Sequence, residues 1–414
     1  PPRRVVVTGV GSVAACGVGR EALRAALRGG RSFIRIITRF DASSCPARIA
    51  GEVEGFDPCA WLDLDEADRL DRSSQFAVAA AAEAVKDAGL ALPGADPRRA
   101  GVCIGIAAGC VDSCEDYLVR QARGDDTLAM GGFYTRIAAS SASAAVARYL
   151  GLRGRTHTLS TGCTTGTDSV GYAFQQIRAG RADVMIAGGT DAPVVPLAYG
   201  CFAIIHAMST RNDDPEHASR PFDRDRDGFV LGEGAGVVVL ESLDHALRRG
   251  ATVYMEVAGY GTTLNAHHMT APTPDGREMA RAISMALDDA RVDLAGIEYV
   301  SAHGSSTPLN DAAETTALKR AFGDHARRLW VSSIKSAIGH TFGAAGGHQA
   351  VAAALAFRDG LVPPPVNLQN PDPACDLDCV PGEPRPRRLG AMLQNACGFC
   401  GKNAALVYRR CDAA

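Results

Sequence analysis

The sequence lacks the features that mark secreted, membrane-spanning and nucleic-acid-binding chains. It has 13 cysteines among 414 residues, far fewer than a disulfide scaffold carries, which favours reduced thiols and a cytoplasmic location. No uninterrupted apolar run reaches the roughly 18 residues that a membrane-spanning helix needs. The 43 Lys and Arg residues nearly balance the 46 Asp and Glu residues, for a net charge of -3. We therefore expect no general affinity for nucleic acid or anionic membranes.

The first residues imitate an export signal, because two arginines at positions 3 and 4 precede three valines. Gly9 and Gly11 interrupt this apolar stretch at once. We interpret residues 4–7 as a β-strand that ends in a glycine turn, rather than as part of a signal peptide.

Glycine is abundant, at 45 residues, and much of it directly follows short apolar segments. Turns from strand to helix often need glycine, so this placement is typical of an α/β protein with buried parallel strands. In the first part of the chain we predict strands at residues 4–7, 102–106, 157–160, 184–187 and 237–240, and helices at 21–27, 75–88 and 169–180.

The same order of elements begins again near residue 253. The second series has predicted strands at residues 253–258, 299–301, 330–333, 392–395 and 404–407, and helices at 277–290, 310–322 and 347–358. We therefore predict a duplicated α/β unit, with an N-terminal lobe at residues 1–252 and a C-terminal lobe at residues 253–414. Ligands of open α/β sheets bind at the carboxyl ends of strands, so both lobes should contribute to one site.

A cysteine lies between a predicted strand and a predicted helix. Cys163 belongs to the segment Ser-Thr-Gly-Cys-Thr-Thr-Gly at residues 160–166. Unpaired amides at a helix N-terminus favour thiolate over thiol, so we expect a lowered pKa for Cys163 and a nucleophilic role. The alternative is a small buried apolar residue, which is what a free cysteine commonly is.

Polar residues after three strands of the second half favour the nucleophilic role. His303 follows one strand, Lys335 and His340 follow the next, and a glycine-rich turn at residues 395–401 follows a third. Taken alone, each of these residues could be an ordinary polar side chain that is hydrogen-bonded or solvated. Taken together, the two imidazoles and the amine are expected to face the thiol of Cys163. The glycines of the 395–401 turn can bring backbone amides to a developing oxyanion, as acyl transfer requires. The four turns therefore predict one pocket for acyl chemistry.

These segments resemble the motifs of the β-ketoacyl synthases, condensing enzymes of the thiolase-like superfamily that occur in dissociated fatty acid and polyketide synthases. The resemblance spans nearly the whole chain and rests on the turns above together with residues 219–234. It implies the thiolase-like fold, an α/β architecture in which two duplicated lobes form five layers, α-β-α-β-α. It also implies an acyltransferase that extends an acyl chain by decarboxylative Claisen condensation with malonyl-acyl carrier protein.

In the family pattern Cys163 accepts the acyl chain from a carrier protein. His303 and His340 then hold the malonyl thioester carbonyl and stabilise the enolate as neutral hydrogen-bond donors. Lys335 is similar to the lysine that orients the His303 side of the site, and Glu314 resembles its carboxylate partner, since a buried lysine needs one.

The resemblance also assigns the groups that contact the substrate. The backbone amides of Cys163 and Phe399 would form the oxyanion hole, and Phe399 is similar to the aromatic gate that moves as the chain loads. The hydroxyls of Ser305 and Thr307 would hold the pantetheine amides, although threonine is more common than serine at position 305. Phe202 would belong to the acyl pocket.

Ala107 and Ala108 stand where fatty acid homologues carry a bulky aliphatic side chain at the acyl pocket. Their small side chains leave room for a longer, stiffer or branched acyl chain, unless neighbouring residues refill the space. The thirteen cysteines and the altered gate resemble a specialised polyketide ketosynthase, the KS alpha subunit of a type II system. The alternative is the housekeeping fatty acid enzyme, β-ketoacyl synthase II.

The gate turn departs from the family pattern at three positions. Cys397 and Cys400 replace the usual phenylalanine and glycine, and Lys402 stands where threonine is common. Together with Cys375 and Cys379 they could suggest a four-thiolate zinc site, but the 397 turn is already part of the acyl pocket, so we expect no metal. We interpret the Asp and Arg run at residues 223–227 as a salt-bridged turn rather than a metal loop.

The resemblance implies an acyl carrier protein as partner and no cofactor beyond its phosphopantetheine arm. It also implies a dimer, either a heterodimer with a chain-length factor or a homodimer. Because carrier proteins are acidic, docking should use a local basic patch, although His206, Asp65 and Glu66 depart from what is expected there. The arginines that could form this patch are Arg69, Arg72, Arg136 and Arg211.

The alternatives to condensation from other functional classes are a degradative thiolase and a catalytically silent chain-length subunit. Thiolases use a second cysteine as base, where this chain offers His303 and His340. The presence of Cys163 argues against a silent subunit. The starter unit, the chain length and any reduction between cycles are not encoded in these motifs.

Overall fold

Two sets of five strands with the same order form the centre of the fold. The computed structural model describes residues 2–91, 96–125 and 133–412. The first set has the order β6-β5-β7-β9-β1, and the second has the order β12-β11-β15-β16-β10. In each set the first three strands are parallel and the fourth is antiparallel to both neighbours. The matching orders confirm the predicted duplication.

The first set consists of β1 (Val5–Ala14), β5 (Ala100–Ile106), β6 (Thr156–His157), β7 (Val184–Asp191) and β9 (Gly234–Ser242). The second consists of β10 (Met255–Leu264), β11 (Ile297–Ser301), β12 (Trp330–Ser332), β15 (Ala391–Cys397) and β16 (Lys402–Arg409). The prediction of parallel strands is therefore wrong for β1, β9, β10 and β16, whose hydrogen-bonded neighbours are antiparallel.

β1 connects the two sets into a continuous sheet. Along its length it pairs with β9, and its first residues, Val5 to Val7, also pair with β10. The chain passes from the first half to the second between α9 (Leu243–Arg248) and β10, where the predicted lobe boundary at residues 252 and 253 lies.

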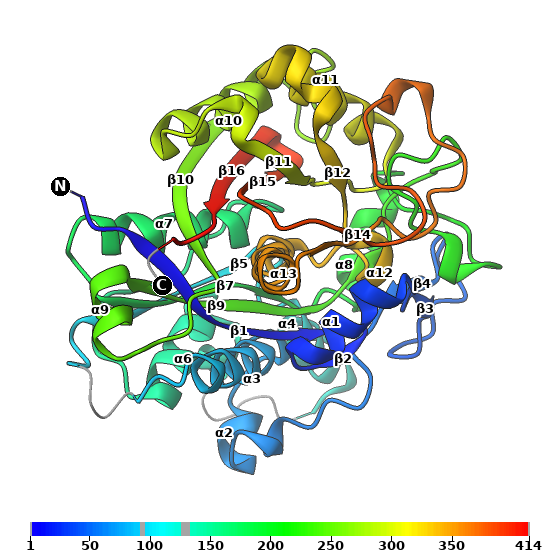
Figure 1. Cartoon of the computed structure of the whole chain (residues 1–414). Helices are drawn as coiled ribbons and strands as arrows, with labels where there is room; N and C mark the ends of the chain where they lie inside the picture. Colours follow the sequence, from blue (N-terminus) through cyan, green and yellow to red (C-terminus); the bar gives the residue numbers. More distant parts are fainter. Residues whose placement is uncertain (1, 92–95, 126–132, 413–414) are drawn as a thin grey trace.

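Helices cover both sets of strands and fill the space between them, which gives the five predicted layers (Figure 1). The outer layer on the first set contains α3 (Arg72–Asp87) and α6 (Ser141–Leu150), and the outer layer on the second contains α10 (Arg277–Ala290) and α11 (Pro308–Phe322). The middle layer contains α7 (Thr165–Arg178) and α13 (Ala345–Asp359). α13 is rich in alanine and glycine and buried on nearly all sides, as a helix between two sheets must be.

The strands β1 and β10 are longer than predicted, because each continues through glycines that were expected to end it. A Cβ atom on Gly9 would lie 2.1 Å from the carbonyl oxygen of Ala84 in α3. In the second half, a Cβ atom on Gly259 would lie 2.2 Å from the carbonyl oxygen of Ala286 in α10. These glycines allow an outer helix to contact the strand backbone, so they mark close packing rather than a turn.

The remaining elements lie around this core. The helices are α1 (Arg20–Gly29), α2 (Leu64–Asp68), α4 (Val111–Arg123), α5 (Phe133–Ile137), α8 (Pro196–Ile204) and α12 (Lys335–Ile338). The strands are β2 (Gly17–Val18), β3 (Arg35–Ile36), β4 (Ile49–Gly51), β8 (Leu231–Gly232), β13 (Leu361–Val362) and β14 (Arg385–Pro386). Among the helices of the described ranges, none is long and apolar enough to cross a bilayer.

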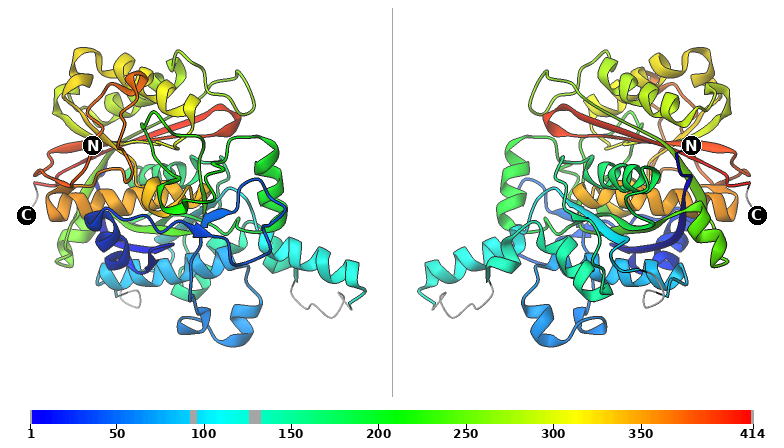
Figure 2. Two further views of the ribbon diagram at one scale, coloured as in Figure 1. Left: turned by 90° about the vertical axis from the view of Figure 1, so that its right-hand side faces the viewer. Right: turned by 90° about the vertical axis from the view of Figure 1, so that its left-hand side faces the viewer.

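Two of these helices project from the body of the molecule. Figure 2 shows α4 and α5 extending away from the five layers. Tyr117 of α4 stacks on Phe133 of α5, with ring centroids 4.5 Å apart. Leu118 is 54% exposed and Tyr134 is 77% exposed, so this projection presents apolar surface to its surroundings.

Candidate active site

The two middle helices approach closely enough to bring residues from both halves together. A Cβ atom on Gly166 of α7 would lie 2.6 Å from the amide nitrogen of Gly347 in α13. Because only glycine permits this contact, it determines how the helices meet. The contact brings Cys163, just before α7, to the loop before α13 that holds His340.

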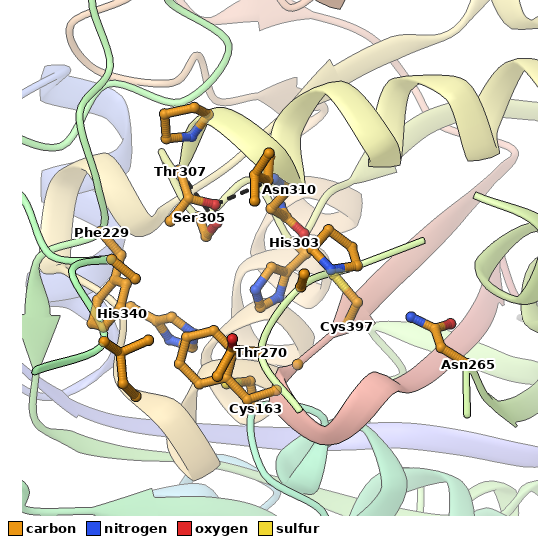
Figure 3. Close-up of a pocket in the computed structure, with 18 of the residues that line it drawn as sticks. Cys163, Phe229, Asn265, Thr270, His303, Ser305, Thr307, Asn310, His340 and Cys397 are labelled. Carbon is orange, nitrogen blue, oxygen red and sulfur yellow. Dashed lines mark hydrogen bonds between the residues drawn. The ribbon is translucent and has the colours of Figure 1, made fainter. Parts of the chain in front are cut away.

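A cavity of about 290 Å³ lies where these segments meet. Cys163, His303 and His340 lie in its wall, as Figure 3 shows. Phe399, in the short helix η9 (Phe399–Gly401), also lines it. The ring centroids of His303 and His340 are 5.2 Å apart, and the two rings are nearly perpendicular. All four turns identified in the sequence therefore contribute to one cavity.

The turn that carries Cys163 is held by a buried carboxylate. Asp168 accepts hydrogen bonds from the hydroxyls of Thr161 at 2.5 Å and Thr164 at 2.7 Å. Its other oxygen accepts a hydrogen bond from the hydroxyl of Tyr260 at 2.6 Å. Tyr260 belongs to β10, so the second half of the fold fixes the position of the cysteine turn.

The electrostatics of Cys163 differ from the sequence-based expectation. Burial raises the pKa of the thiol to about 11, although hydrogen bonds from the amides of Phe399 and Cys163 and the charge of Lys335 act in the opposite direction. The prediction of a lowered pKa is wrong because desolvation of the thiolate outweighs these favourable contacts. In this conformation Cys163 carries its proton at neutral pH.

This pKa predicts a steep pH dependence for alkylation of Cys163. Thiolate is the reactive form, so its alkylation by iodoacetamide should rise about tenfold per pH unit from pH 7 to 9.5. The measurement is the rate of modification of the Cys163 peptide by mass spectrometry, with an unstructured peptide that contains one cysteine, capped at both ends, as a control whose rate levels off near its own pKa of about 8.5. A plateau for Cys163 below pH 8.5 would contradict a raised pKa.

His340 is held as a neutral hydrogen-bond donor. Its Nδ1 accepts a hydrogen bond from the Phe342 amide at 3.2 Å, so the proton of the neutral ring lies on Nε2. Burial lowers the pKa values of His340 and His303 well below 6.5, and the nearby Lys335 charge lowers them further. Both rings are therefore uncharged at neutral pH, which agrees with the family pattern of two neutral donors.

Lys335 lies behind His303 rather than in the cavity wall. Its Nζ donates a hydrogen bond to the His303 carbonyl oxygen at 2.5 Å, and the residue is only 3% exposed. Burial lowers the pKa of Lys335, and the nearby Glu314 carboxylate raises it. The expectation that the amine faces the thiol directly is therefore wrong, and Lys335 acts on the site through the His303 backbone and through its charge.

Glu314 of α11 holds the same turn from the other side. Its carboxylate accepts hydrogen bonds from the amides of His303 at 2.7 Å and Gly304 at 2.8 Å, and from the Asn395 side chain at 2.6 Å. Among the ion pairs of residues 2–91, 96–125 and 133–412, a Glu314–Lys335 pair does not occur. The predicted partnership is thus indirect, because both side chains bind the His303 turn.

The gate turn is strained and bound to a neighbouring loop. Cys400 has a φ angle of 63°, in the left-handed region that favours glycine. The amide of Cys400 donates to the Met269 carbonyl at 2.5 Å, and the amide of Asn265 donates to the Gly401 carbonyl at 2.8 Å. The ring of Phe399 thus lies on a turn that the 265–269 loop restrains.

The proposed pantetheine and acyl-chain residues differ in their relation to the cavity. Ser305 and Thr307 line it, and their hydroxyls are 2.9 Å apart. Ala107, Ala108 and Phe202 are not among its lining residues. Phe202 instead packs on Phe342, with ring centroids 4.5 Å apart, and both rings belong to the same apolar cluster as Ala107.

Asp191 is a buried residue that the sequence analysis did not single out. At the end of β7 it accepts hydrogen bonds from the amides of Ala107 at 3.1 Å, Ala108 at 3.0 Å and Gly343 at 2.6 Å. Burial raises its pKa to about 7. Asp191 therefore connects the loop of Ala107 and Ala108 to the loop after His340. Its position shortly after the predicted strand at residues 184–187 is the feature of the sequence that could have indicated a role at the site.

Two possible metal sites were considered from the sequence, a four-cysteine zinc site and a metal loop at residues 223–227. Within the described ranges, no three His, Cys, Asp or Glu side chains gather as metal ligands. Cys375 and Cys379 pack in an apolar cluster, whereas Cys397 lines the cavity. The 223–227 segment is ion-paired as predicted, with Arg226 contacting Asp372 at 2.5 Å.

The four arginines considered for carrier docking have different surroundings. The Arg72 guanidinium donates to the buried Glu233 carboxylate at 2.9 Å and lies 4.6 Å from the Phe76 ring centroid, so its charge is already paired within the fold. Arg69 is exposed and Arg136 is half-buried. Arg211 follows Thr210, whose amide donates to the cavity-lining Asp227.

Comparisons with known families agree with this geometry. The N-terminal domain of the beta-ketoacyl synthases matches residues 2–246, and the C-terminal domain of the same family matches residues 254–369. This chain belongs to the β-ketoacyl synthase family. Synthases of this family are acyltransferases that take their substrates from the phosphopantetheine arm of acyl carrier protein and need no added cofactor.

Relatives of the synthase come from both polyketide and fatty acid systems. It is 47% identical over 415 residues to the tetracenomycin polyketide synthase ketoacyl synthase alpha subunit of Streptomyces glaucescens, covering 99% of this chain and 97% of that protein. It is 44% identical over 408 residues to 3-oxoacyl-[acyl-carrier-protein] synthase 2 of a Synechocystis species, and the match covers 99% of this chain and 98% of that protein.

Solved structures confirm the thiolase-like fold. One, described as a type II polyketide synthase acyl-carrier protein in complex with its ketosynthase bound to the hexaketide, matches with a TM-score of 0.93 and 37% identity, over 99% of this chain and 100% of that chain. Another, the ishigamide ketosynthase/chain length factor, matches with a TM-score of 0.92 and 39% identity, over 99% of this chain and 100% of that chain.

Proposed function

We propose that the synthase elongates a polyketide chain by decarboxylative condensation of a Cys163-bound acyl group with malonyl-acyl carrier protein. The observation that carries this proposal is the meeting of Cys163, His303 and His340 in one cavity. A nucleophile and two neutral donors in a buried site suit acyl transfer followed by enolate formation. Housekeeping fatty acid elongation is the alternative, because relatives of that kind are nearly as similar.

In the first half-reaction the sulfur of Cys163 attacks the thioester carbonyl of the carrier-bound acyl chain. The carrier thiol leaves with the proton that Cys163 gives up, and the acyl group stays on Cys163. The amides of Phe399 and Cys163 already donate hydrogen bonds toward this sulfur. They are therefore close enough to the acyl carbon to stabilise the oxyanion that forms there.

In the second half-reaction malonyl on the carrier loses carbon dioxide, and the electrons of the broken bond form an enolate. His303 and His340 would hold the enolate oxygen, since both are neutral and His340 carries its proton on Nε2. The enolate carbon then attacks the Cys163 thioester, which releases the thiolate and forms one carbon–carbon bond. Lys335 and Glu314 are positioning residues that hold the His303 turn.

The other substrate contacts follow from the cavity wall. Ser305 and Thr307 would hold the pantetheine amides, since their hydroxyls line the cavity that leads to Cys163. Phe399 would act as the gate. Ala107, Ala108 and Phe202 would contact the acyl chain after the Phe202 and Phe342 rings separate.

We propose that residues 1–252 and 253–414 act as two lobes and that the synthase works as a dimer, with a chain-length factor as the sister subunit. The exposed apolar side chains of α4 and α5 and the unpaired sheet edge at β6 suit contact with such a subunit. A relative in structure is itself described as a ketosynthase/chain length factor. A homodimer is the alternative.

The test combines the synthase with a sister subunit, an acyl carrier protein and malonyl donor, and measures the acyl chains on the carrier by mass spectrometry. Unreduced chains that lengthen by two carbons per cycle, in a reaction that requires the sister subunit, are expected. Elongation of saturated chains by the synthase alone would favour the fatty acid alternative. A matched reaction without the sister subunit is the control.

A further inference from the structure

Phe342, two residues after His340, has a backbone conformation that a bulky side chain rarely adopts. Its φ angle is 46°, in the left-handed region that favours glycine. In this conformation its amide donates to His340 Nδ1 at 3.2 Å, and its ring stacks on the His340 ring with centroids 4.7 Å apart. Backbone strain of this kind persists only where neighbouring contacts hold the chain in place. The orientation of the His340 ring therefore depends on whatever holds Phe342.

Asp191 supplies a contact that holds this backbone. Its Oδ2 accepts a hydrogen bond at 2.6 Å from the amide of Gly343, the residue directly after Phe342. Asp191 is 0% exposed, so solvent does not compete for this oxygen. The approach is close enough to require glycine, because a Cβ atom on Gly343 would lie 2.6 Å from the same oxygen.

The same carboxylate is anchored on the central sheet. Asp191 is the last residue of β7, which pairs with β5 up to the contact of Thr190 with Ile106. The amides of Ala107 and Ala108, directly after β5, donate to Oδ2 at 3.1 Å and to Oδ1 at 3.0 Å. Asp191 therefore ties the strained turn to the ends of two buried strands.

The backbone contacts of His340 itself do not replace this one. The His340 amide donates to the Val230 carbonyl at 2.7 Å, and the Gly232 amide donates to the His340 carbonyl at 2.9 Å. These bonds fix the main chain of His340 but leave its ring free to rotate. The ring is fixed by Phe342, and Asp191 holds the peptide that follows Phe342.

We propose that Asp191 is a positioning residue for the decarboxylation half-reaction. It holds Phe342 in its strained conformation, and Phe342 keeps the His340 ring oriented with its proton on Nε2, toward the enolate oxygen that forms. Acylation of Cys163 relies on backbone amides of other segments, so it depends much less on this contact. The inference rests on the proposed condensation and adds a residue that acts on one of its two half-reactions.

The role depends on two acceptor oxygens rather than on negative charge. Burial raises the pKa of Asp191 to about 7, but a protonated carboxyl keeps a lone pair on each oxygen for the three amides. An asparagine instead places an amino group where one of those oxygens stood, facing a backbone N–H. Asp191→Asn therefore removes part of the contact without changing the size of the side chain.

The experiment measures the two half-reactions separately. Carbon dioxide release from malonyl-carrier is followed with Asp191→Asn in the Cys163→Gln background, where no acylation occurs, and acylation by butyryl-carrier is followed with Asp191→Asn alone. The kcat of carbon dioxide release should fall about tenfold or more, because a small displacement of a catalytic group is costly. The KM for malonyl-carrier and the rate of acylation should stay within about twofold.

Glu241→Gln is the matched control. It also replaces a carboxylate that is 0% exposed by an amide, but Glu241 pairs with Val184, at the opposite end of the strand pair in which Asp191 faces Gly234. The ratio of the two half-reaction rates should not change in this variant. A general loss of stability therefore does not imitate the expected result.

Gly343→Ala breaks the same contact from the other side, because its Cβ atom displaces the Asp191 oxygen. It should show the same selective loss, and it decides the question if Asp191→Asn does not fold. Equal losses in both half-reactions, or no loss in either, would overturn the role of Asp191. Absence of carbon dioxide release from Cys163→Gln itself, or of acylation in the wild type, would instead reject the proposed condensation.

Discussion

Replacing Cys163 by alanine is expected to abolish acyl transfer and chain elongation, with a loss of about 10⁴-fold or more in rate. The reason is that the covalent acyl intermediate forms on this sulfur, and in the described part of the cavity wall the other thiol, Cys397, has a pKa raised well above its usual range by burial. The measurement is acyl loading on the protein by mass spectrometry, with carbon–carbon bond formation on the carrier followed in parallel.

The control for Cys163→Ala is Cys59→Ala, which removes an exposed thiol on the surface. Cys163→Gln provides a second readout, because an amide of similar size to a short acyl thioester leaves His303 and His340 in place. This variant should still release carbon dioxide from malonyl-carrier but form no condensation product. Elongation by either variant would show that another residue is the nucleophile.

Removing either imidazole is expected to stop the second half-reaction. His303→Ala and His340→Ala should each lower malonyl decarboxylation by about 10²–10³-fold, because each ring is proposed to donate a hydrogen bond to the enolate oxygen in a buried site. Loading of Cys163 should fall much less, since the oxyanion hole for that step consists of backbone amides. The two steps are measured separately, as carbon dioxide release and as acylated protein.

The pH profile of decarboxylation tests the protonation state of these rings. The pKa values of His303 and His340 are lowered well below 6.5, so both rings stay neutral as pH falls through their ordinary value. The rate should therefore be nearly constant between pH 6 and 8, and a loss from protonation should begin only at lower pH. An exposed histidine, His217, provides the control variant His217→Ala. A rate that halves near pH 6.5 would contradict neutral, buried imidazoles.

Patterns along the chain predicted the duplication but not the direction of every strand, because β1, β9, β10 and β16 pair antiparallel with their neighbours. The repeated order of strands and helices predicted two equivalent halves, and the structure has the same strand order in both. The predicted strands ended too early at Gly9 and Gly259, because a glycine that allows close packing of a helix looks the same in a sequence as a glycine that allows a turn. Only the position of α3 and α10 distinguishes the two cases.

The catalytic groups were recognisable because each follows a strand and parallel strands end at one edge. Of the residues that support them, Lys335 and Glu314 were named from the family resemblance, whereas Tyr260 and Asp191 were not recognised. Tyr260 lies in the middle of β10 and nothing in its neighbours predicts a hydrogen bond to Asp168, which is 92 positions away. Lys335 was correctly placed near His303, but that it binds the carbonyl from behind depends on how α12 packs.

By itself the sequence determined which chemical groups are present, their order in two repeated units, and the family to which the chain belongs. The tertiary structure decided how far those groups are from water and from one another. Local spacing specifies the start of a helix beside Cys163, but the solvent lost by the thiolate depends on contacts from both halves, so the direction of its pKa shift could not be predicted from neighbours in the chain. The same holds for the His340 tautomer, because it depends on which atoms the completed fold brings within hydrogen-bond distance of the ring.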